Sequence, residues 1–534
     1  MKPLTQEQQS WVDKTFASLS VEERLAQLFI TKINHPGEVD SLAELAKTIP
    51  FGGLFVWGAT ADEHRARIQR LQKASRVPLV VSADLETGAG SAAVGMTLFP
   101  DNLAVAAANS EELAYAMGRA AGVEGRSIGV HWTFAPVVDV NLHPDNPIAN
   151  TRGLGDDPER IGRIASAIVR GLQEHGIAGC AKHFPGDGTD DVDQHVVTSV
   201  NALSMEQWKR ISGRTFNTAF QAGVMSTMIG HIALPAWDGE LDARRSYRPA
   251  TVSRRIVTDL LRREMGFEGV IVTDDMNMGG VSGYMNHRDR TVGCLAAGCD
   301  MILFPDLPQD FQTLLEAMRS GALSEQRVNE SARRVLEFKA RLDLHCGELF
   351  GPPATPEQTR EFQAASRKIA EQAICCVRDL NHIFPLTGLR PGGRVLTVTL
   401  TNDVDLPDVD RELTARGYRV EHLRNPEDWS LSGRWRGADA VFVNFAFRAN
   451  WATNGVRSVG PHNRIFMGGF HTEHPRVIFT SFGSPYHLRQ FSAVTNYVNV
   501  HSCTRESQRA AVAAWFGEIP MPAKSPAGNL TRGF

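Results

Sequence analysis

The sequence predicts an α/β protein: an N-terminal (β/α)8 barrel of the TIM type, followed by a C-terminal open α/β domain resembling an αβα sandwich. Short apolar runs recur through the first two thirds of the chain, and amphipathic stretches lie between most of them. Eight strand–helix repeats over roughly 250 to 400 residues are typical of such a barrel. A Gly- and Pro-rich stretch at 346–356 then separates the repeats from a second group of strand-like runs.

The expected barrel strands are short and mostly apolar: residues 28–30, 53–56, 79–81, 132–138, 177–181, 224–229, 270–272 and 301–304. The clearest amphipathic helices are expected at 61–74, 158–174, 205–222, 253–265 and 309–320. Polar or glycine residues follow several strands, at 82–86, 139–141, 182–183, 230–231 and 273–275. Catalytic groups of barrel enzymes come from the carboxyl ends of the strands, so we expect the active site there.

The last third of the chain has its own pattern of strands and helices. A long helix is expected over 356–373, followed by strand-like runs at 394–400, 438–445 and 477–482 and helices at 406–416 and 505–516. We therefore expect a catalytic barrel over 1–345, a linker and connecting helix over 346–375, and an α/β domain over 376–534. The tail from Pro520 is expected to lie extended over the surface.

The composition is that of a soluble globular protein with a small-molecule substrate. The 534 residues are 42% hydrophobic and 22% charged, with a formal net charge of -4 and no basic stripe for nucleic acid. No apolar run is long enough for a bilayer, and the first residues lack a secretory pattern, which predicts a cytoplasmic location. The seven cysteines form no CxxC pair and are expected to be reduced, buried thiols.

The segment 182–195 carries the densest chemistry in the chain. It reads Lys-His-Phe-Pro-Gly-Asp-Gly-Thr-Asp-Asp-Val-Asp-Gln-His and directly follows the apolar run 177–181. Its two glycines and one proline force a turn, which presents Lys182, His183, Asp187, Asp193 and His195 from a loop. Histidines interleaved with carboxylates place groups that titrate near neutral pH beside groups that orient them. We therefore predict a catalytic or binding loop instead of a solvated surface turn.

This segment resembles the signature of glycoside hydrolase family 3, in particular its β-N-acetylglucosaminidase branch. There, Lys-His-Phe-Pro-Gly-x-Gly is followed, after four residues, by Asp-(Ser/Thr)-His. Further segments are similar to the family in the same order: 134–139, 152–158, 249–253 and 273–276. The resemblance covers about residues 20–305, and the last third is only loosely similar to the family's C-terminal domain.

The resemblance implies retaining hydrolysis in two steps, with Asp274 as nucleophile and His195 as general acid/base, supported by Asp193. One group attacks the anomeric carbon, and the other protonates the leaving oxygen and later activates water. An imidazole titrates near neutrality without a large pKa shift, and Asp193 would fix its tautomer. Asp275 remains an alternative nucleophile.

The resemblance also implies a sugar clamp, in which Lys182, His183, Asp84 and Arg152 bind hydroxyls of the non-reducing sugar. It implies no metal and no organic cofactor. The expected substrates are small soluble β-N-acetylglucosaminides, such as chito-oligosaccharides or cell-wall fragments, with neither nucleic acid nor membrane as partner. The oligomeric state stays open.

Three departures from the family pattern leave the natural substrate open. Gln194 stands where the family has Ser or Thr, and Asp187 stands where the cell-wall-recycling members have His. The segment after Asp84 also lacks the two arginines of the pattern Asp-Gln-Glu-Gly-Gly-Arg-Val-x-Arg.

Four alternatives follow from these residues. A β-N-acetylglucosaminide phosphorylase is one, because a neutral histidine repels phosphate less than a glutamate does. A β-glucosidase of the same family is another; its acid/base would come from the second domain, where Glu473 is the candidate. A metal-dependent hydrolase could draw ligands from 183–195. A carbohydrate-binding protein without turnover is the last.

Overall fold

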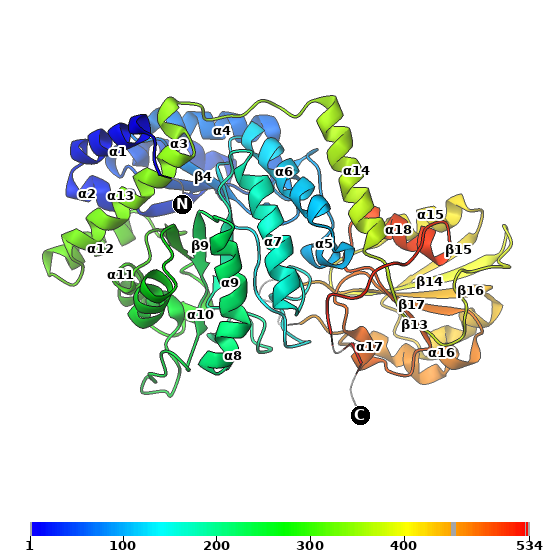
Figure 1. The fold of residues 1–534 in the computed structure, drawn as a ribbon. Coiled ribbons are helices and arrows are strands. Elements are labelled where there is room, and N and C mark those ends of the chain that lie inside the picture. The colour runs from blue at the N-terminus through cyan, green and yellow to red at the C-terminus, as the bar shows by residue number, and fades with distance from the viewer. Residues whose placement is uncertain (1–2, 450–454, 529, 532–534) are drawn as a thin grey trace.

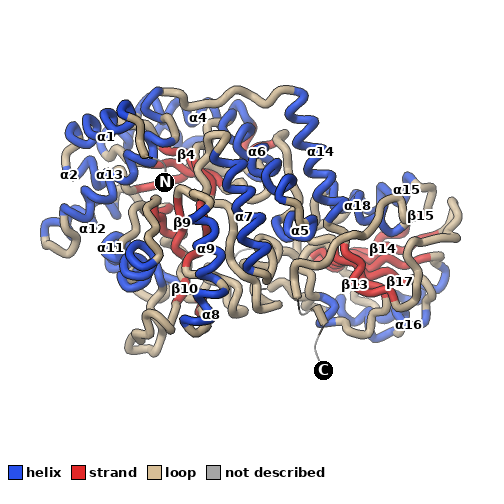
Figure 2. The backbone as a smooth tube through the Cα atoms, in the orientation of Figure 1, coloured by secondary structure: helices blue, strands red, loops and turns tan. Residues whose placement is uncertain are grey.

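The first domain is a closed barrel of parallel strands surrounded by helices (Figures 1 and 2). The computed structural model describes residues 3–449, 455–528 and 530–531. The barrel strands are β1 (Phe29–Lys32), β2 (Gly53–Phe55), β4 (Val80–Ala83), β6 (Trp132–Thr133), β7 (Cys180–Phe184), β9 (Ser226–Ile229), β11 (Val270–Thr273) and β12 (Ile302–Leu303). Each of the apolar runs expected to be a barrel strand therefore overlaps one.

The strands pair in two arcs, β12-β1-β2-β4-β6 and β11-β9-β7. Isolated parallel β-bridges join the two arcs. Trp132 pairs with Ala178 and Val137 with Lys182 where β6 meets β7, and Val272 pairs with Met301 where β11 meets β12. All of these pairings are parallel. The carboxyl ends of the strands consequently share one rim, and the predicted barrel is confirmed.

Helices connect successive strands and cover the outside of the barrel. They are α3 (Val39–Thr48), α4 (Ala61–Ala74), α5 (Asn102–Ala108), α6 (Glu111–Ser127), α7 (Pro158–Gln173), α8 (Met205–Arg210), α9 (Ser212–Gln221), the π-helical segment η4 (Arg255–Glu264), α10 (Gly279–Ser282), α11 (His287–Ala297), α12 (Gln309–Arg319) and α13 (Glu325–Arg341). Two further helices, α1 (Gln6–Ser18) and α2 (Val21–Ala26), precede β1.

The helix expected over 205–222 is interrupted at Ile211, whose ψ of -93° is not helical. Trp208 is buried on α8, and its indole N–H donates to the carbonyl of Pro185 at 2.8 Å. This contact anchors α8 beneath the loop that follows β7. The helix is therefore divided where the chain must support that loop.

Two small strand pairs extend the barrel rim. They are β3 (Ala59–Thr60) with β5 (Ala93–Val94), and β8 (Ser199–Val200) with β10 (Ile232–Ala233). The second pair holds the chain directly after His195 against the chain that follows β9.

The second domain is an open α/β sandwich (Figure 1). Its six strands lie in the order β13-β18-β17-β16-β14-β15, and only β13 is antiparallel to its neighbour. They are β13 (Cys375–Asp379), β14 (Arg394–Thr401), β15 (Arg419–Arg424), β16 (Ala440–Ala446), β17 (Val477–Ser481) and β18 (Asn496–Asn499). The predicted open α/β architecture is confirmed, although the sequence did not indicate β13, β15 or β18.

Helices pack on both faces of this sheet. One face carries α14 (Pro356–Gln372), α15 (Pro407–Ala415) and α18 (Arg505–Trp515). The other carries η6 (Trp429–Gly437), η7 (Pro461–Gly468), α16 (Phe470–Glu473) and α17 (His487–Gln490).

Helix α14 lies at the junction of the two domains and belongs to both cores. Phe362 and Ile369 pack in the barrel core, whereas Ala370 and the following Ile374 pack in the core of the second domain. Ser366 also donates to the carbonyl of Leu98 at 2.9 Å. The connection between the domains is thus a packed helix.

Two expectations need correction. The tail after Pro520 is not simply extended over the surface, because Pro526 is buried and its carbonyl accepts a hydrogen bond from the Asp156 N–H at 3.1 Å. The cysteines are free, but Cys346 and Cys376 are exposed instead of buried. Among the described residues, no helix is both long and apolar enough to cross a membrane.

Candidate active site

A charged cluster occupies the rim between β4 and β7. The Lys182 ammonium lies 3.2 Å from Asp84 Oδ1 and 2.6 Å from Glu86 Oε1. Arg152 donates to the same Glu86 carboxylate through Nε at 3.1 Å and Nη2 at 2.8 Å. Three residues of the predicted sugar clamp therefore come together around Glu86, to which the sequence assigned no role. Its only signal was its place in the polar strand end 82–86.

Glu86 and Lys182 are both ionised at neutral pH. Burial would raise the pKa of Glu86, but Arg152 and Lys182 hold the pKa of this carboxyl far below its ordinary value. Desolvation would lower the pKa of Lys182, but Asp84 and Glu86 raise it. The side chain of Lys182 is 4% exposed and that of Asp84 is 46% exposed, so Asp84 is the cluster's outward-facing carboxylate.

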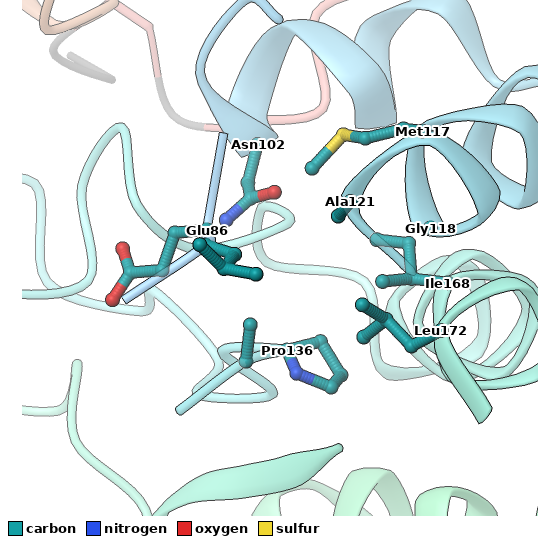
Figure 3. A pocket seen from close by; sticks show the side chains of 10 residues that line it. Glu86, Asn102, Met117, Gly118, Ala121, Pro136, Ile168 and Leu172 are labelled. Carbon is teal, nitrogen blue, oxygen red and sulfur yellow. The ribbon is translucent and has the colours of Figure 1, made fainter. Parts of the chain in front are cut away.

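A small cavity of about 10 Å³ lies behind this cluster, between α6, α7 and the ends of the strands (Figure 3). Apolar side chains such as Met117, Ile168 and Leu172 line it, and the carboxylate of Glu86 points away from them. Such a space holds about one water molecule. It is a packing gap and not the place where a sugar binds.

His183 is held by a buried carboxylate that the sequence did not single out. Its Nδ1 lies 2.7 Å from Asp139 Oδ2, and its backbone N–H donates to Asp139 Oδ1 at 3.0 Å. The N–H of Asp187 donates to the same oxygen at 2.8 Å. Asp139 thus fixes both the imidazole of His183 and the turn that follows β7.

The predicted proton-transfer pair forms in the loop. Nδ1 of His195 lies 2.7 Å from Asp193 Oδ1, which also accepts the backbone N–H of His195 at 2.8 Å. The side chain of Asp193 is fully buried, whereas that of His195 is 23% exposed. A buried carboxylate therefore orients an imidazole that stays accessible, as in a catalytic triad.

The loop that carries Asp193 and His195 is docked on the segment that follows β11. Gly279 N–H donates to the His195 carbonyl at 2.8 Å, and Gly280 N–H donates to the Gln194 carbonyl at 3.0 Å. Thr198 returns a hydrogen bond from its hydroxyl to the Gly280 carbonyl at 2.7 Å. A Cβ on Gly279 would lie 2.1 Å from the Val196 carbonyl oxygen, so the close approach requires glycine.

Asp274 directly follows β11 and is partly buried. Burial alone would raise its pKa, but the nearby His183, His231 and His195 hold the pKa of this carboxyl below its ordinary value. Asp274 is therefore ionised at neutral pH. Asp275 differs: its Oδ1 accepts both the N–H and the side-chain amide of Asn277, each at 2.9 Å, in a local turn.

Gln194 and Asp187, the two residues of this loop that depart from the family pattern, are hydrogen-bonded to each other. Gln194 donates through Nε2 to Asp187 Oδ2 at 3.2 Å and accepts the His231 N–H on Oε1 at 2.8 Å. Asp187 Oδ1 accepts from the Asn146 amide at 2.9 Å. Burial and the neighbouring Asp139 raise the pKa of Asp187 well above its usual range.

Two alternative assignments gain no support from the arrangement. Among the described residues, the His, Cys, Asp and Glu groups close enough to share a metal ion include none from 182–195. Glu473 lies on α16 in the second domain, and its carboxylate is close to Gly469 of the same segment: a Cβ added to this glycine would lie 3.3 Å from Glu473 Oε1. In the part of the chain that is described, no hydrogen bond or ion pair joins Glu473 to the barrel.

Comparisons with known proteins agree with this geometry. Residues 20–338 match the glycosyl hydrolase family 3 N terminal domain. A β-N-acetylglucosaminidase/β-glucosidase from Cellulomonas fimi is 31% identical over 97% of this chain and 95% of its own length. The structure of a β-glucoside phosphorylase, BglX, superposes with a TM-score of 0.89 at 29% identity, covering 99% of this chain and 98% of that one.

A family 3 β-N-acetylglucosaminidase from Paenibacillus sp. shares the fold, with a TM-score of 0.85 at 24% identity over 97% of this chain and 100% of that one. These relatives and the barrel define the class of the protein, which is a glycoside hydrolase. The chain belongs to glycosyl hydrolase family 3.

Proposed function

We propose that this protein is a retaining exo-β-N-acetylglucosaminidase, which removes terminal β-linked N-acetylglucosamine from small soluble glycosides in the cytoplasm. The observation that carries the proposal is the Asp193–His195 pair at 2.7 Å, on a loop hydrogen-bonded to the segment after Asp274. Retaining hydrolysis needs such an acid/base held at a fixed position relative to a nucleophile.

In the first step, the Asp274 carboxylate attacks the anomeric carbon while the His195 imidazolium gives its proton to the leaving oxygen. This breaks the glycosidic bond and forms a glycosyl ester on Asp274. In the second step, neutral His195 takes a proton from water, the water oxygen attacks the anomeric carbon, and Asp274 leaves as a carboxylate. Asp193 stabilises the imidazolium in both steps.

The assignment of Asp274 over Asp275 rests on their surroundings. The hydrogen bonds to Asn277 occupy one oxygen of Asp275, whereas three histidines favour the ionised form of Asp274. In the proposed clamp, Asp84, Lys182, His183 and Arg152 bind sugar hydroxyls through charge-assisted hydrogen bonds. The name of the Cellulomonas fimi relative, a β-N-acetylglucosaminidase/β-glucosidase, supports an N-acetylglucosaminide as substrate and is also compatible with a glucoside.

A panel of aryl β-glycosides tests the proposal with the native chain and three variants. We expect the N-acetylglucosaminide to be cleaved faster than the glucoside. Asp274→Ala should abolish turnover, Asp193→Asn should lower kcat by about 10²- to 10⁴-fold, and Asp275→Asn should retain the most activity of the three. Faster cleavage of the glucoside would make the protein a β-glucosidase, and full activity of Asp274→Ala would refute the mechanism.

Phosphorolysis is a second candidate, favoured by the similarity to the β-glucoside phosphorylase BglX over nearly the whole chain. Phosphate would then replace water in the second step, and neutral His195 would not repel it as a carboxylate would. Product analysis with and without inorganic phosphate separates the two reactions. Sugar 1-phosphate as the main product would replace hydrolysis as the proposed function.

A further inference from the structure

A group of metal-ligating side chains lies outside the active site, where the N-terminal helix meets the end of the barrel. Glu7 belongs to α1, and His345 and Cys346 belong to the short helical turn η5 (Leu344–Cys346), which follows α13. One potential ligand atom from each residue lies within 4.8 Å of the other two. We propose that Glu7, His345 and Cys346 bind a divalent transition-metal ion of the Zn²⁺ type.

The distances suit tetrahedral coordination. Zinc–sulfur and zinc–nitrogen bonds of about 2.3 and 2.0–2.1 Å at a tetrahedral angle place the two donor atoms roughly 3.5 Å apart. Cys346 Sγ lies 3.3 Å from His345 Nε2, close to that value. A carboxylate oxygen of Glu7 lies within 4.8 Å of the other two ligand atoms, and water would complete the fourth position.

The donor set distinguishes between metals. Thiolate and imidazole ligands select Zn²⁺ and similar ions, whereas Mg²⁺ and Ca²⁺ prefer oxygen ligands alone. Two further carboxylates, Asp343 and Glu348, lie near the thiol. The negative charge of these carboxylates attracts a cation. When the metal binds, it replaces the proton of the Cys346 thiol, which is released to solvent.

The position of the group gives the metal a structural role. Gln8, next to Glu7, donates to the Ala340 carbonyl at 3.0 Å, and Asp13 pairs with Arg333 at 2.7 Å, so α1 lies along the end of α13. Cys346 stands where the chain leaves α13 towards α14. A bound ion would therefore tie α1 to the start of the connection between the domains, and this role does not depend on the proposed reaction.

Cobalt titration tests the site, because Co²⁺ replaces Zn²⁺ and a cysteine ligand adds a thiolate-to-metal absorption band. The full chain is freed of metal by a chelator under reducing conditions and titrated with Co²⁺ alone. We expect one equivalent to produce the band and Zn²⁺ to displace it. Cys346→Ser should abolish the band, and His345→Ala and Glu7→Gln should weaken Co²⁺ binding at least tenfold.

Cys376→Ser is the matched control, since Cys376 is the other exposed cysteine among the described residues. It should keep the band. Zn²⁺ should also raise the thermal midpoint of the native chain and of Cys376→Ser, but not that of Cys346→Ser. No thiolate band in the native chain, or an unchanged band in Cys346→Ser, would overturn the proposal.

Discussion

Gln194 and Asp187 are hydrogen-bonded to each other inside the loop that follows β7, from Nε2 of Gln194 to Oδ2 of Asp187 at 3.2 Å. Both residues depart from the family pattern, and the contact shows that the two departures form one local unit. The direction of this hydrogen bond is fixed because Gln194 Oε1 must accept the His231 N–H. Asp187 can therefore only accept from Gln194.

This polarity predicts the outcome of a double-mutant cycle. Asp187→Asn can place an amide donor opposite the amide of Gln194, and Gln194→Glu places a second carboxylate opposite Asp187. Each single change should destabilise the protein by about 1–3 kcal/mol, the cost of a buried group left unpaired. In the double variant, the new amide at position 187 donates to the new carboxylate at position 194. That carboxylate still accepts from His231, so much of the loss should return.

The coupling is measured by thermal unfolding and kcat of the native chain, the two single variants and the double variant. Residues in contact usually have a coupling free energy of about 0.5–3 kcal/mol. Simple addition of the two single effects would show that the pair is not a unit.

The docking of the loop that carries the proposed acid/base His195 predicts a specific effect of Gly279→Ala. The added methyl group would meet the Val196 carbonyl oxygen at 2.1 Å, so the loop carrying His195 must move away from the Asp274 segment. We expect kcat to fall at least tenfold on the preferred aryl glycoside, with a smaller change in KM. Gly293→Ala on α11 is the control, because its methyl group would meet Val252 at an ordinary 3.4 Å. Equal kinetics in both variants would contradict the docking.

Glu86→Gln tests the shared carboxylate of the clamp. The change leaves Lys182 and Arg152 close together without their common counter-charge. Removing one partner of a buried ion cluster costs about 3–5 kcal/mol, so we expect lower stability and a higher KM. Glu44→Gln disrupts only the exposed pair with Lys47 and should cost less than about 1 kcal/mol.

The contribution of Glu86 to stability should also depend on pH. The pKa of this carboxyl is lowered on folding from an ordinary value of 4.5. Its stabilising effect is therefore complete above this pH and is lost as the pH falls below it. The native chain and Glu86→Gln should accordingly differ in unfolding free energy at pH 7 and converge in acid.

Lys339 predicts a pH dependence of the same sign in a more alkaline range. This residue is fully buried, donates to Gln27 Oε1 at 2.7 Å, and has its pKa lowered by burial from 10.5 to about 7. Between these two values the unfolded chain binds a proton that the folded chain does not, so stability rises with pH across the interval.

Relative to Lys339→Met, the native chain should gain about 1.4 kcal/mol per pH unit from pH 7 upwards, and on the order of 5 kcal/mol in all by pH 10.5. Chemical denaturation of both proteins at pH 7, 8 and 9 measures the difference. A constant difference would mean that Lys339 does not titrate in this range.

The barrel could be predicted because strands buried on both faces leave continuous apolar runs, as in 270–272. The edge strand β15 was missed because its residues, Arg-Val-Glu-His-Leu-Arg, are largely polar and only partly buried. Lys182 and His183 lie within β7, and not in the loop that was expected to present them, because the turn begins only at Pro185. The other predicted site residues follow strands or lie in loops, and the residue types indicated the chemistry.

The supporting carboxylates were not predictable in the same way. Glu86 meets Arg152 from 66 residues away, and Asp139 meets His183 from 44 residues away. Local spacing carries no information on such pairings, because they are created when the barrel closes and brings the strand ends onto one rim.

Helix α14 has a consequence for protein engineering. Phe362 and Ile369 pack in the core of the barrel, while Ala370 and Ile374 pack in the core of the second domain. A barrel truncated before residue 356 would expose apolar surface and aggregate, and a grafted second domain from another family member would meet a mismatched helix. Chimeras of this enzyme therefore need crossover points that leave α14 together with both of its packing surfaces.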